Sequence, residues 1–267
     1  MEPLMITATP NICWLKPEVP YPQTINALVE EALLCRAAGA AVLHMHAEQR
    51  WAEVIDAIRE RTDLVIQCGM SSLTLADRIE VMHQHGDEIS VILGHHDEAF
   101  AELDMHRLHP REELLEYCEA SREYGVKLEF EVWNTGHIWN LNWLIERQAT
   151  DAPHITTLFF GWPGGQWSPP TVREYLYRRE YMPEGSVVTV STMGPDQRAI
   201  MATAIAVGDH VRVGTEDYPY GRQGNVVPTH QLVDEARQLA SAMGRTIASP
   251  QEARRLLGLS PKDGARA

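Results

Sequence analysis

The sequence lacks the long apolar runs and the basic surface that mark several common classes of protein. No apolar run approaches the roughly 20 residues needed to span a bilayer, and Met1-Glu2-Pro3 is acidic where a secretory signal would be basic. The 23 basic residues are outnumbered by 37 acidic ones, and the formal charge of -14 argues against a general nucleic-acid or anionic-membrane surface. We therefore expect a cytoplasmic protein whose partners are small molecules.

Cysteine is scarce as well. The 4 cysteines lie far apart and form no CxxC pair; they are Cys13, Cys35, Cys68 and Cys118. This pattern favours free, mostly buried thiols in a reducing compartment over a disulfide.

What is present is enough apolar material for a large core. The chain has 267 residues, of which 44% are hydrophobic and 22% charged, and its 18 Gly and 16 Pro are scattered. A low-complexity or disordered chain is thereby excluded. At this length one α/β barrel is as plausible as two smaller domains, so length alone does not choose between them.

Strand and helix patterns alternate along the whole chain. Residues 4–9 form a β-rich apolar run, and residues 24–38 repeat apolar side chains at helical spacing before Gly39. The other expected strands are 41–46, 64–68, 89–93, 126–132, 154–160, 186–191 and 210–213, with helices near 51–61, 73–85, 111–124, 137–148, 170–180, 196–207 and 229–243.

About eight strand–helix units predict an α/β fold of the (β/α)8 TIM-barrel type. Strands separated by helices pair in parallel, because a parallel connection has to cross over. A doubly wound open sheet is the alternative, but no Gly-x-Gly-x-x-Gly follows the first strand. We expect one barrel domain over residues 1–267 with a short C-terminal helical extension, and a site at the C-terminal ends of the strands.

The second expected strand ends in His44-Met45-His46. Alternate residues of a strand face the same side, so both imidazoles should point together at the barrel mouth. Neutral imidazoles bind Zn²⁺ and similar ions, and a catalytic site needs a third protein ligand and an open position. A pair of hydrogen-bonded histidines at the rim is the alternative.

The eighth expected strand brings charged residues to the same mouth. Arg212, Glu216 and Asp217 lie where this strand emerges, next to strand one and close to strand two. Glu216 can therefore complete a site with two histidines and one carboxylate. Asp217 is then a candidate general base that a cation positions, although a solvated acidic loop paired with Arg212 would have the same sequence.

These segments together resemble the β-keto acid cleavage enzymes. The resemblance rests on His44-Met45-His46, on residues 211–217 (VRVGTED) and on residues 161–165 (GWPGG). Residues 129–132 (EFEV), 231–233 (QLV) and 249–254 (SPQEAR) agree with the same family, so the likeness spans nearly the whole chain.

The resemblance implies a zinc-dependent barrel with one metal ion per chain. It implies a reaction between a β-keto acid and the co-substrate acetyl-CoA, giving acetoacetate and a new acyl-CoA by a retro-Claisen route. By position, His44, His46 and Glu216 match the metal ligands, Asp217 matches the base and Arg212 its cationic partner. We expect Asp217 to remove a carbon-bound proton from acetyl-CoA. The family also favours a homo-oligomer, with a tetramer as the expected form.

Several loops depart from the family, and they concern substrate recognition. Gly69 stands where a hydroxyl is expected after strand three, and Ser71 or Ser72 can substitute for it. After strand four, His95 and His96 are adjacent and so point in different directions; at most one faces the pocket, and we take His95 as a substrate-binding candidate.

Four further candidates concern the two substrates. Trp14 occupies a position where one branch of the family carries a glutamate for an ammonium group, which favours a neutral or apolar substrate tail. Glu131 keeps one carboxylate near the pocket. Gly164 and Gly165 could let backbone amides approach an anionic part of CoA.

Two other functions remain open at this stage. Metal-dependent amidohydrolases are barrels with a His-x-His pair and an acidic residue on strand eight, but their pair lies on strand one. A non-catalytic barrel that keeps zinc for stability alone would retain the same ligands.

Overall fold

The structure is a computed structural model that describes residues 1–13, 16, 18–47, 50–69, 74–84, 86–97, 106–162 and 168–261. Five of the candidate residues lie outside the described residues: Trp14, Ser71, Ser72, Gly164 and Gly165. Their expected roles in binding substrate and acetyl-CoA therefore remain predictions.

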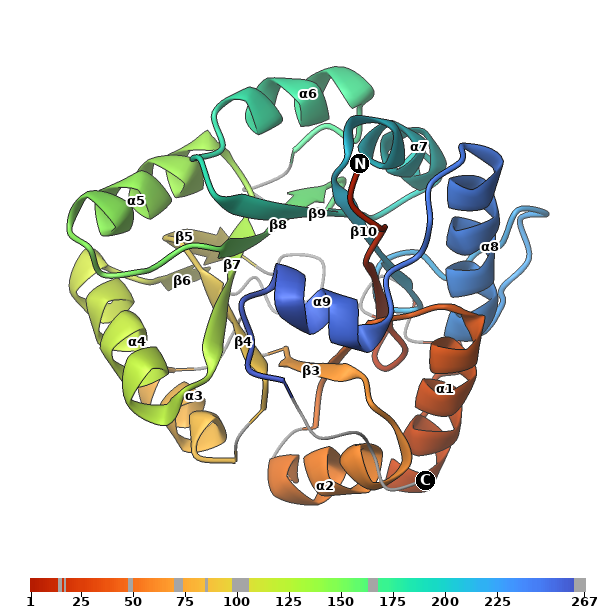
Figure 1. The fold of residues 1–267 in the computed structure, drawn as a ribbon, viewed down its shortest axis with the longest axis horizontal. Coiled ribbons are helices and arrows are strands. Elements are labelled where there is room, and N and C mark those ends of the chain that lie inside the picture. Colours follow the sequence, from red (N-terminus) through yellow and green to blue (C-terminus); the bar gives the residue numbers. More distant parts are fainter. Residues whose placement is uncertain are drawn as a thin grey trace.

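A closed barrel of eight parallel strands forms the centre of the molecule (Figure 1). Its strands are joined in the order β1-β10-β9-β8-β7-β4-β3-β2. Closure comes from the pairing of β1 with both β10 and β2, which confirms the barrel and excludes the open sheet. The strands are β1 (Ile6–Thr9), β2 (Val42–Met45), β3 (Val65–Cys68), β4 (Glu88–Ile92), β7 (Lys127–Val132), β8 (His154–Phe160), β9 (Ser186–Thr192) and β10 (His210–Gly214).

A ring of helices covers the outside of the barrel. These helices are α1 (Ile25–Ala38), α2 (Trp51–Arg61), α3 (Leu75–Met82), α4 (Arg111–Tyr124), α5 (Thr135–Glu146), α6 (Val172–Glu180), α7 (Gln197–Val207) and α8 (Thr229–Ala242). The hydroxyl of Thr24 caps the start of α1, and Gly39 ends it with a φ of 117°, a conformation that favours glycine. In the part of the chain that the structure describes, no helix has both the length and the apolar character needed to cross a bilayer.

A short antiparallel hairpin follows β4 and was not expected from the sequence. Its strands are β5 (His95–Asp97) and β6 (His106–Leu108). Three polar residues carry no strand periodicity, so this hairpin could not be distinguished from a loop. His137 Nε2 lies 3.1 Å from the carbonyl of His95, and Asn140 donates to the carbonyl of Leu93 at 2.6 Å, which ties the hairpin to α5.

The helix α9 (Pro250–Leu256) closes the N-terminal end of the barrel, where Figure 1 shows it across the centre of the ring. Backbone bonds from Leu4 to Thr246 (2.7 Å) and from Ala248 to Leu4 (2.8 Å) dock the segment that leads into α9 against the chain before β1. Apolar side chains from three strands, from the residue before β1 and from the α9 region form one buried cluster: Met5, Val42, Val65, Ile155, Ala253 and Leu257. This end of the barrel is therefore filled, and the opposite end carries the polar residues.

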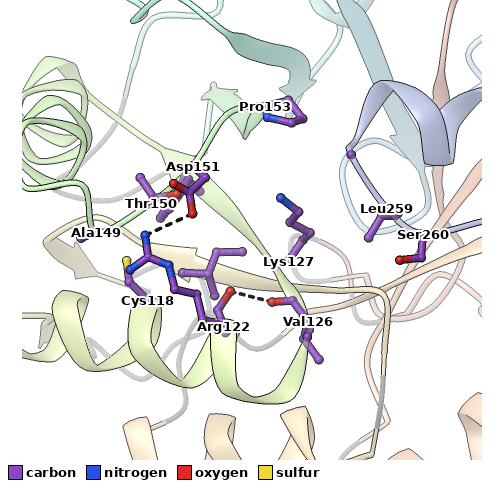
Figure 2. A pocket seen from close by; sticks show the side chains of 15 residues that line it. Cys118, Arg122, Val126, Lys127, Ala149, Thr150, Asp151, Pro153, Leu259 and Ser260 are labelled. Carbon is purple, nitrogen blue, oxygen red and sulfur yellow. Dashed lines mark hydrogen bonds and ion pairs between the residues drawn. The ribbon is translucent and has the colours of Figure 1, made fainter.

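A cavity of about 250 Å³ also lies at the N-terminal end, between the start of β7, the segment before β8 and the residues after α9 (Figure 2). Arg122 pairs there with Asp151 at 3.1 Å and donates to the carbonyl of Gln148 at 2.6 Å, while Lys127 extends toward the space. The strands run from this cavity toward the opposite end of the barrel. The cavity is therefore separate from the residues at the barrel mouth, where the C-terminal ends of the strands lie.

All four cysteines are free and buried. Burial raises the pKa of Cys118 to about 12, which keeps this thiol protonated and unreactive at neutral pH.

Candidate active site

Three predicted metal ligands meet at the C-terminal end of the barrel. In β2, Leu43 and Met45 belong to the hydrophobic core, so His44 faces the barrel interior, where 1% of its surface is exposed. His44 Nε2 lies 3.3 Å from His46 Nε2 and 3.4 Å from Glu216 Oε2, and His46 Nε2 lies 3.3 Å from Glu216 Oε1.

The spacing of these atoms fits a tetrahedral ion. Two atoms that each lie about 2.05 Å from a tetrahedral ion are about 3.3 Å apart, which is the separation found for the three pairs. The donor atoms all lie within 4.8 Å of one another. Glu216 Oε2 is buried and accepts no hydrogen bond from the described residues, so this oxygen has a free lone pair.

Gly69, which directly follows β3, leaves room beside the two histidines. A Cβ atom at this position would lie 2.5 Å from His44 Nε2 and 2.6 Å from His46 Nε2. In this chain a side chain at position 69 would fill the space that the donor nitrogens face, and glycine leaves that space open.

Electrostatics keep His44 and Glu216 in the protonation states that bind metals. Burial, reinforced by the nearby Arg212, lowers the pKa of His44, so its imidazole is neutral. Burial disfavours the ionised form of Glu216, but the positive charge of Arg212 outweighs burial and holds the pKa of Glu216 well below its usual range.

Two buried residues that the sequence analysis missed orient His44. Gln67 of β3 pairs in register with His44 of β2, and Glu88 of β4 pairs in register with Gln67. His44 Nδ1 lies 2.7 Å from Gln67 Oε1, and Gln67 Nε2 donates to Glu88 Oε2 at 2.7 Å. Because Gln67 Oε1 can only accept, Nδ1 carries the proton and the Nε2 lone pair is free. The signal in the sequence that could have found Gln67 and Glu88 is that both are polar residues within buried strands.

Arg212 joins the two carboxylates that follow β10. It donates to Asp217 Oδ2 through Nε at 3.1 Å and to Asp217 Oδ1 through Nη2 at 2.9 Å, and Nη2 also lies 2.8 Å from Glu216 Oε1. Ser191 Oγ donates to Asp217 Oδ2 at 2.9 Å. Burial raises the pKa of Asp217 against the opposing effect of Arg212, which makes Asp217 a stronger base than an exposed aspartate.

Hydrogen bonds from the segment after β1 to the segments after β2 and β10 fix the loops that carry these groups. Asn11, which follows β1, accepts from the backbone N–H of His46 at 3.0 Å and donates to the carbonyl of His46. Thr215 donates to the carbonyl of Pro10 at 2.8 Å, and its own N–H donates to Thr229 Oγ1 at 3.1 Å. Asn11 and Thr215 were also absent from the predicted site.

Glu131 lies inside the barrel beside an aromatic cluster. Trp133 Nε1 donates to Glu131 Oε2 at 3.0 Å, and the Trp133 ring stacks on Phe159 at 4.7 Å with Trp162 edge-on at 5.2 Å. Burial, with the neighbouring Glu129, raises the pKa of Glu131 to about 8. The Arg212 guanidinium lies 5.2 Å from the centre of the Phe159 ring, so this cluster adjoins the charged residues.

The two adjacent histidines of the β5–β6 hairpin point in different directions, as expected. The side chain of His95, the substrate-binding candidate, is exposed and stacks with His106 at 5.7 Å. His96 is 2% exposed and packs against Trp133 at 4.9 Å, so His96 is the one that lies toward the aromatic cluster.

Comparison with known proteins identifies the family. The model of the β-keto acid cleavage enzyme family matches residues 3–259. A 3-keto-5-aminohexanoate cleavage enzyme of Fusobacterium nucleatum is 31% identical, over 97% of this chain and 99% of the relative. A 3-dehydrocarnitine:acetyl-CoA trimethylamine transferase of Rhizobium meliloti is 26% identical, over 90% of this chain and 91% of the relative.

A solved structure agrees on the fold. The binary complex of ObcA with oxaloacetate has a TM-score of 0.71 at 16% sequence identity, over 90% of this chain and 68% of that one. With the barrel, the residues at its mouth and the family match over nearly the whole length, the chain belongs to the β-keto acid cleavage enzymes.

Proposed function

We propose that the protein converts a β-keto acid and acetyl-CoA to acetoacetate and a new acyl-CoA. The observation that carries the proposal is the convergence of His44, His46 and Glu216. Beside them lies Asp217, to which Arg212 donates two hydrogen bonds. Relatives named as β-keto acid cleavage enzymes and acetyl-CoA transferases support the same reaction class.

The products determine which bonds change. Acetoacetate contains the carboxylate and C2 of the keto acid together with the acetyl group, so the new bond joins C2 to the acetyl carbonyl carbon. The proton that Asp217 removes therefore comes from C2 of the keto acid, and our expectation that it comes from acetyl-CoA does not balance. The C2 carbanion displaces the CoA thiolate from the acetyl group. The thiolate then attacks C3, the C2–C3 bond breaks, and Asp217 returns its proton to C2 of acetoacetate.

The residues at the barrel mouth have separate tasks in this proposal. We assign His44, His46 and Glu216 as ligands of one Zn²⁺ ion per chain, which when bound supplies a Lewis acid that polarises the keto oxygen. Arg212 and Ser191 aim the Asp217 carboxylate and limit its motion. Arg212 also places positive charge near the enolate that forms when C2 loses its proton.

Three further expectations belong to the proposal. The four free cysteines support a cytoplasmic protein. Exposed aromatic side chains in the α5–α6 region, Trp139, Tyr177 and Tyr181, support a homo-oligomer, with a tetramer as the proposed form. We also propose one barrel domain over residues 1–267 with a short C-terminal helical extension.

Product analysis tests the reaction. Purified protein with bound zinc is incubated with acetyl-CoA and a panel of β-keto acids, and mass spectrometry follows acetoacetate and new thioesters. We expect both to form in equal amounts with at least one keto acid. Release of free acids without a new thioester would instead indicate a hydrolase of the amidohydrolase kind. His154, a residue that such enzymes could use, lies at the start of β8, the end of the barrel away from this site.

The hydrogen bond from Gln67 predicts the strength of metal binding. Gln67→Met keeps the volume but removes the acceptor for His44 Nδ1, so the imidazole can rotate or change tautomer. We expect the affinity for Zn²⁺ to fall by about 10- to 100-fold, as is usual when a group that orients a metal ligand is lost. Competition with a chromophoric chelator measures the affinity, with Gln84→Met, at a half-buried position after α3, as the control. Equal affinities in the two variants would contradict the orienting role.

Substrate polarity is a second expected result. The pKa of about 8 leaves Glu131 largely protonated at pH 7, and Trp133 already bonds one of its oxygens, so it is a poor partner for an ammonium group. With Trp14 offering no charge, neutral β-keto acids should exceed amino-substituted ones in kcat/KM by at least about tenfold, roughly 1.4 kcal/mol. Two substrates of equal length, ending in methyl and in ammonium, provide the comparison. An ammonium preference that disappears in Glu131→Gln would refute this reading.

A further inference from the structure

A cavity of about 460 Å³ opens beside His46 and runs outward between the N-terminal ends of α1 and α2. We call it the α1–α2 groove. Its inner end is lined by Asn11, His46 and Ala47, and its outer part reaches Tyr21 and Arg50. The volume falls in the range typical of sites for small molecules. Of the three donors, His46 is the one with an appreciably exposed side chain, at 15%, so the groove meets the candidate metal site at its most accessible ligand.

The walls of the groove suit a long, neutral chain with amide groups. Ile12, Ile25, Leu28 and Val54 supply apolar surface, and Asn11 together with residues near Gln23 supplies polar atoms. None of the described residues that line the groove is acidic. A substrate tail that carries an ammonium group would therefore find no countercharge among these described residues.

Arg50 supplies positive charge at the outer end. It donates to Glu53 at 2.6 Å and 3.0 Å, but the side chains are 61% and 60% exposed, and exposed pairs of this kind contribute little stability. A phosphate could therefore share or take over this guanidinium at small cost. In a chain with a formal charge of -14, a local cation is what allows a polyanion to approach.

We propose that the α1–α2 groove receives the pantetheine arm of acetyl-CoA, with the thioester at the His46 end and the phosphates at Arg50. This inference rests on the proposed function and adds the place of the second substrate. A β-keto acid is short enough to lie wholly at the barrel mouth, whereas the thioester carries a long neutral arm that ends in phosphates. Glu131 and the aromatic cluster of β7 and β8 lie across the barrel from β1 and β2, which leaves that side for the keto acid.

Two variants separate the arm from the phosphates. Ile25→Trp fills part of the groove and should raise the KM for both acetyl-CoA and S-acetyl-pantetheine by about tenfold, because the arm is common to both. Arg50→Gln should raise the KM for acetyl-CoA by about three- to tenfold and leave the KM for S-acetyl-pantetheine unchanged, because only CoA carries the phosphates. Both variants should leave the KM for the keto acid within about twofold. Arg36→Gln, which removes an exposed paired arginine outside the groove, is the matched control.

Calorimetry with desulfo-CoA on the zinc-loaded protein supplies a readout that does not depend on turnover. Arg50→Gln should weaken its binding by a factor similar to the change in KM, and Glu53→Gln, which frees Arg50, should strengthen it. This measurement decides the question if Ile25→Trp fails to fold. A rise in the KM for the keto acid alone, or desulfo-CoA binding that is insensitive to both Arg50→Gln and Glu53→Gln, would overturn the proposal. Absence of any new acyl-CoA with the unaltered protein would refute the proposed reaction instead, and desulfo-CoA binding would still test the groove.

Discussion

Asp217→Asn is expected to fold and to keep its metal while turnover falls by about two to four orders of magnitude. The amide cannot accept the C2 proton, whereas its shape still fits between Arg212 and Ser191. Arg212 keeps a charged partner in the variant, because its Nη2 lies 2.8 Å from Glu216 Oε1. The measurements are kcat, metal content by elemental analysis and the melting temperature.

Glu216→Gln is the matched comparison, since it makes the same chemical change at the neighbouring position. It removes a donor that faces both histidines, so metal content should fall there and stay unchanged in Asp217→Asn. Metal loss of similar size in both variants would mean that the base and the ligand have been assigned the wrong way round.

Loss of the metal is the second large effect that we expect. Purified protein should contain about one divalent ion per chain, and His46→Ala should abolish most of it together with turnover, because two remaining donors hold an ion far more weakly than three. Inductively coupled plasma spectrometry on dialysed protein measures the content.

His95→Ala serves as its control. His95 is exposed on the β5–β6 hairpin, so the variant should retain the ion. Full retention of metal in a variant with alanine at both His44 and His46 would refute the metal site altogether.

The barrel and its charged mouth could be predicted because each depends on local periodicity. A strand repeats every two residues, so His44 and His46 had to share a face, and eight alternating units placed the end of strand eight beside the start of the chain. The bounds of α2 and α4 were expected from helical spacing alone and are found at the same residues.

The residues that orient the site could not be predicted in this way. Gln67 and Glu88 are single polar residues in apolar strands, and their partnership appears only when the register between β2, β3 and β4 is known. Asn11 and Thr215 form hydrogen bonds with backbone groups that are far away in the sequence. The spacing of residues along the chain cannot predict such contacts. The role of Gly69 depends on the space in front of it and not on any chemical group.

The separation of the donors along the chain affects how the protein acquires its site. His46 and Glu216 are 170 positions apart, and β1 pairs with β10, so the last donor arrives with the strand that closes the barrel. At 5–20 residues per second, a ribosome needs about 10–30 s to synthesise the intervening chain. During that time the histidines can bind an ion only weakly, and metal loading follows ring closure. An ion held by all three donors would then tie β2 to the end of β10 and oppose their separation during unfolding.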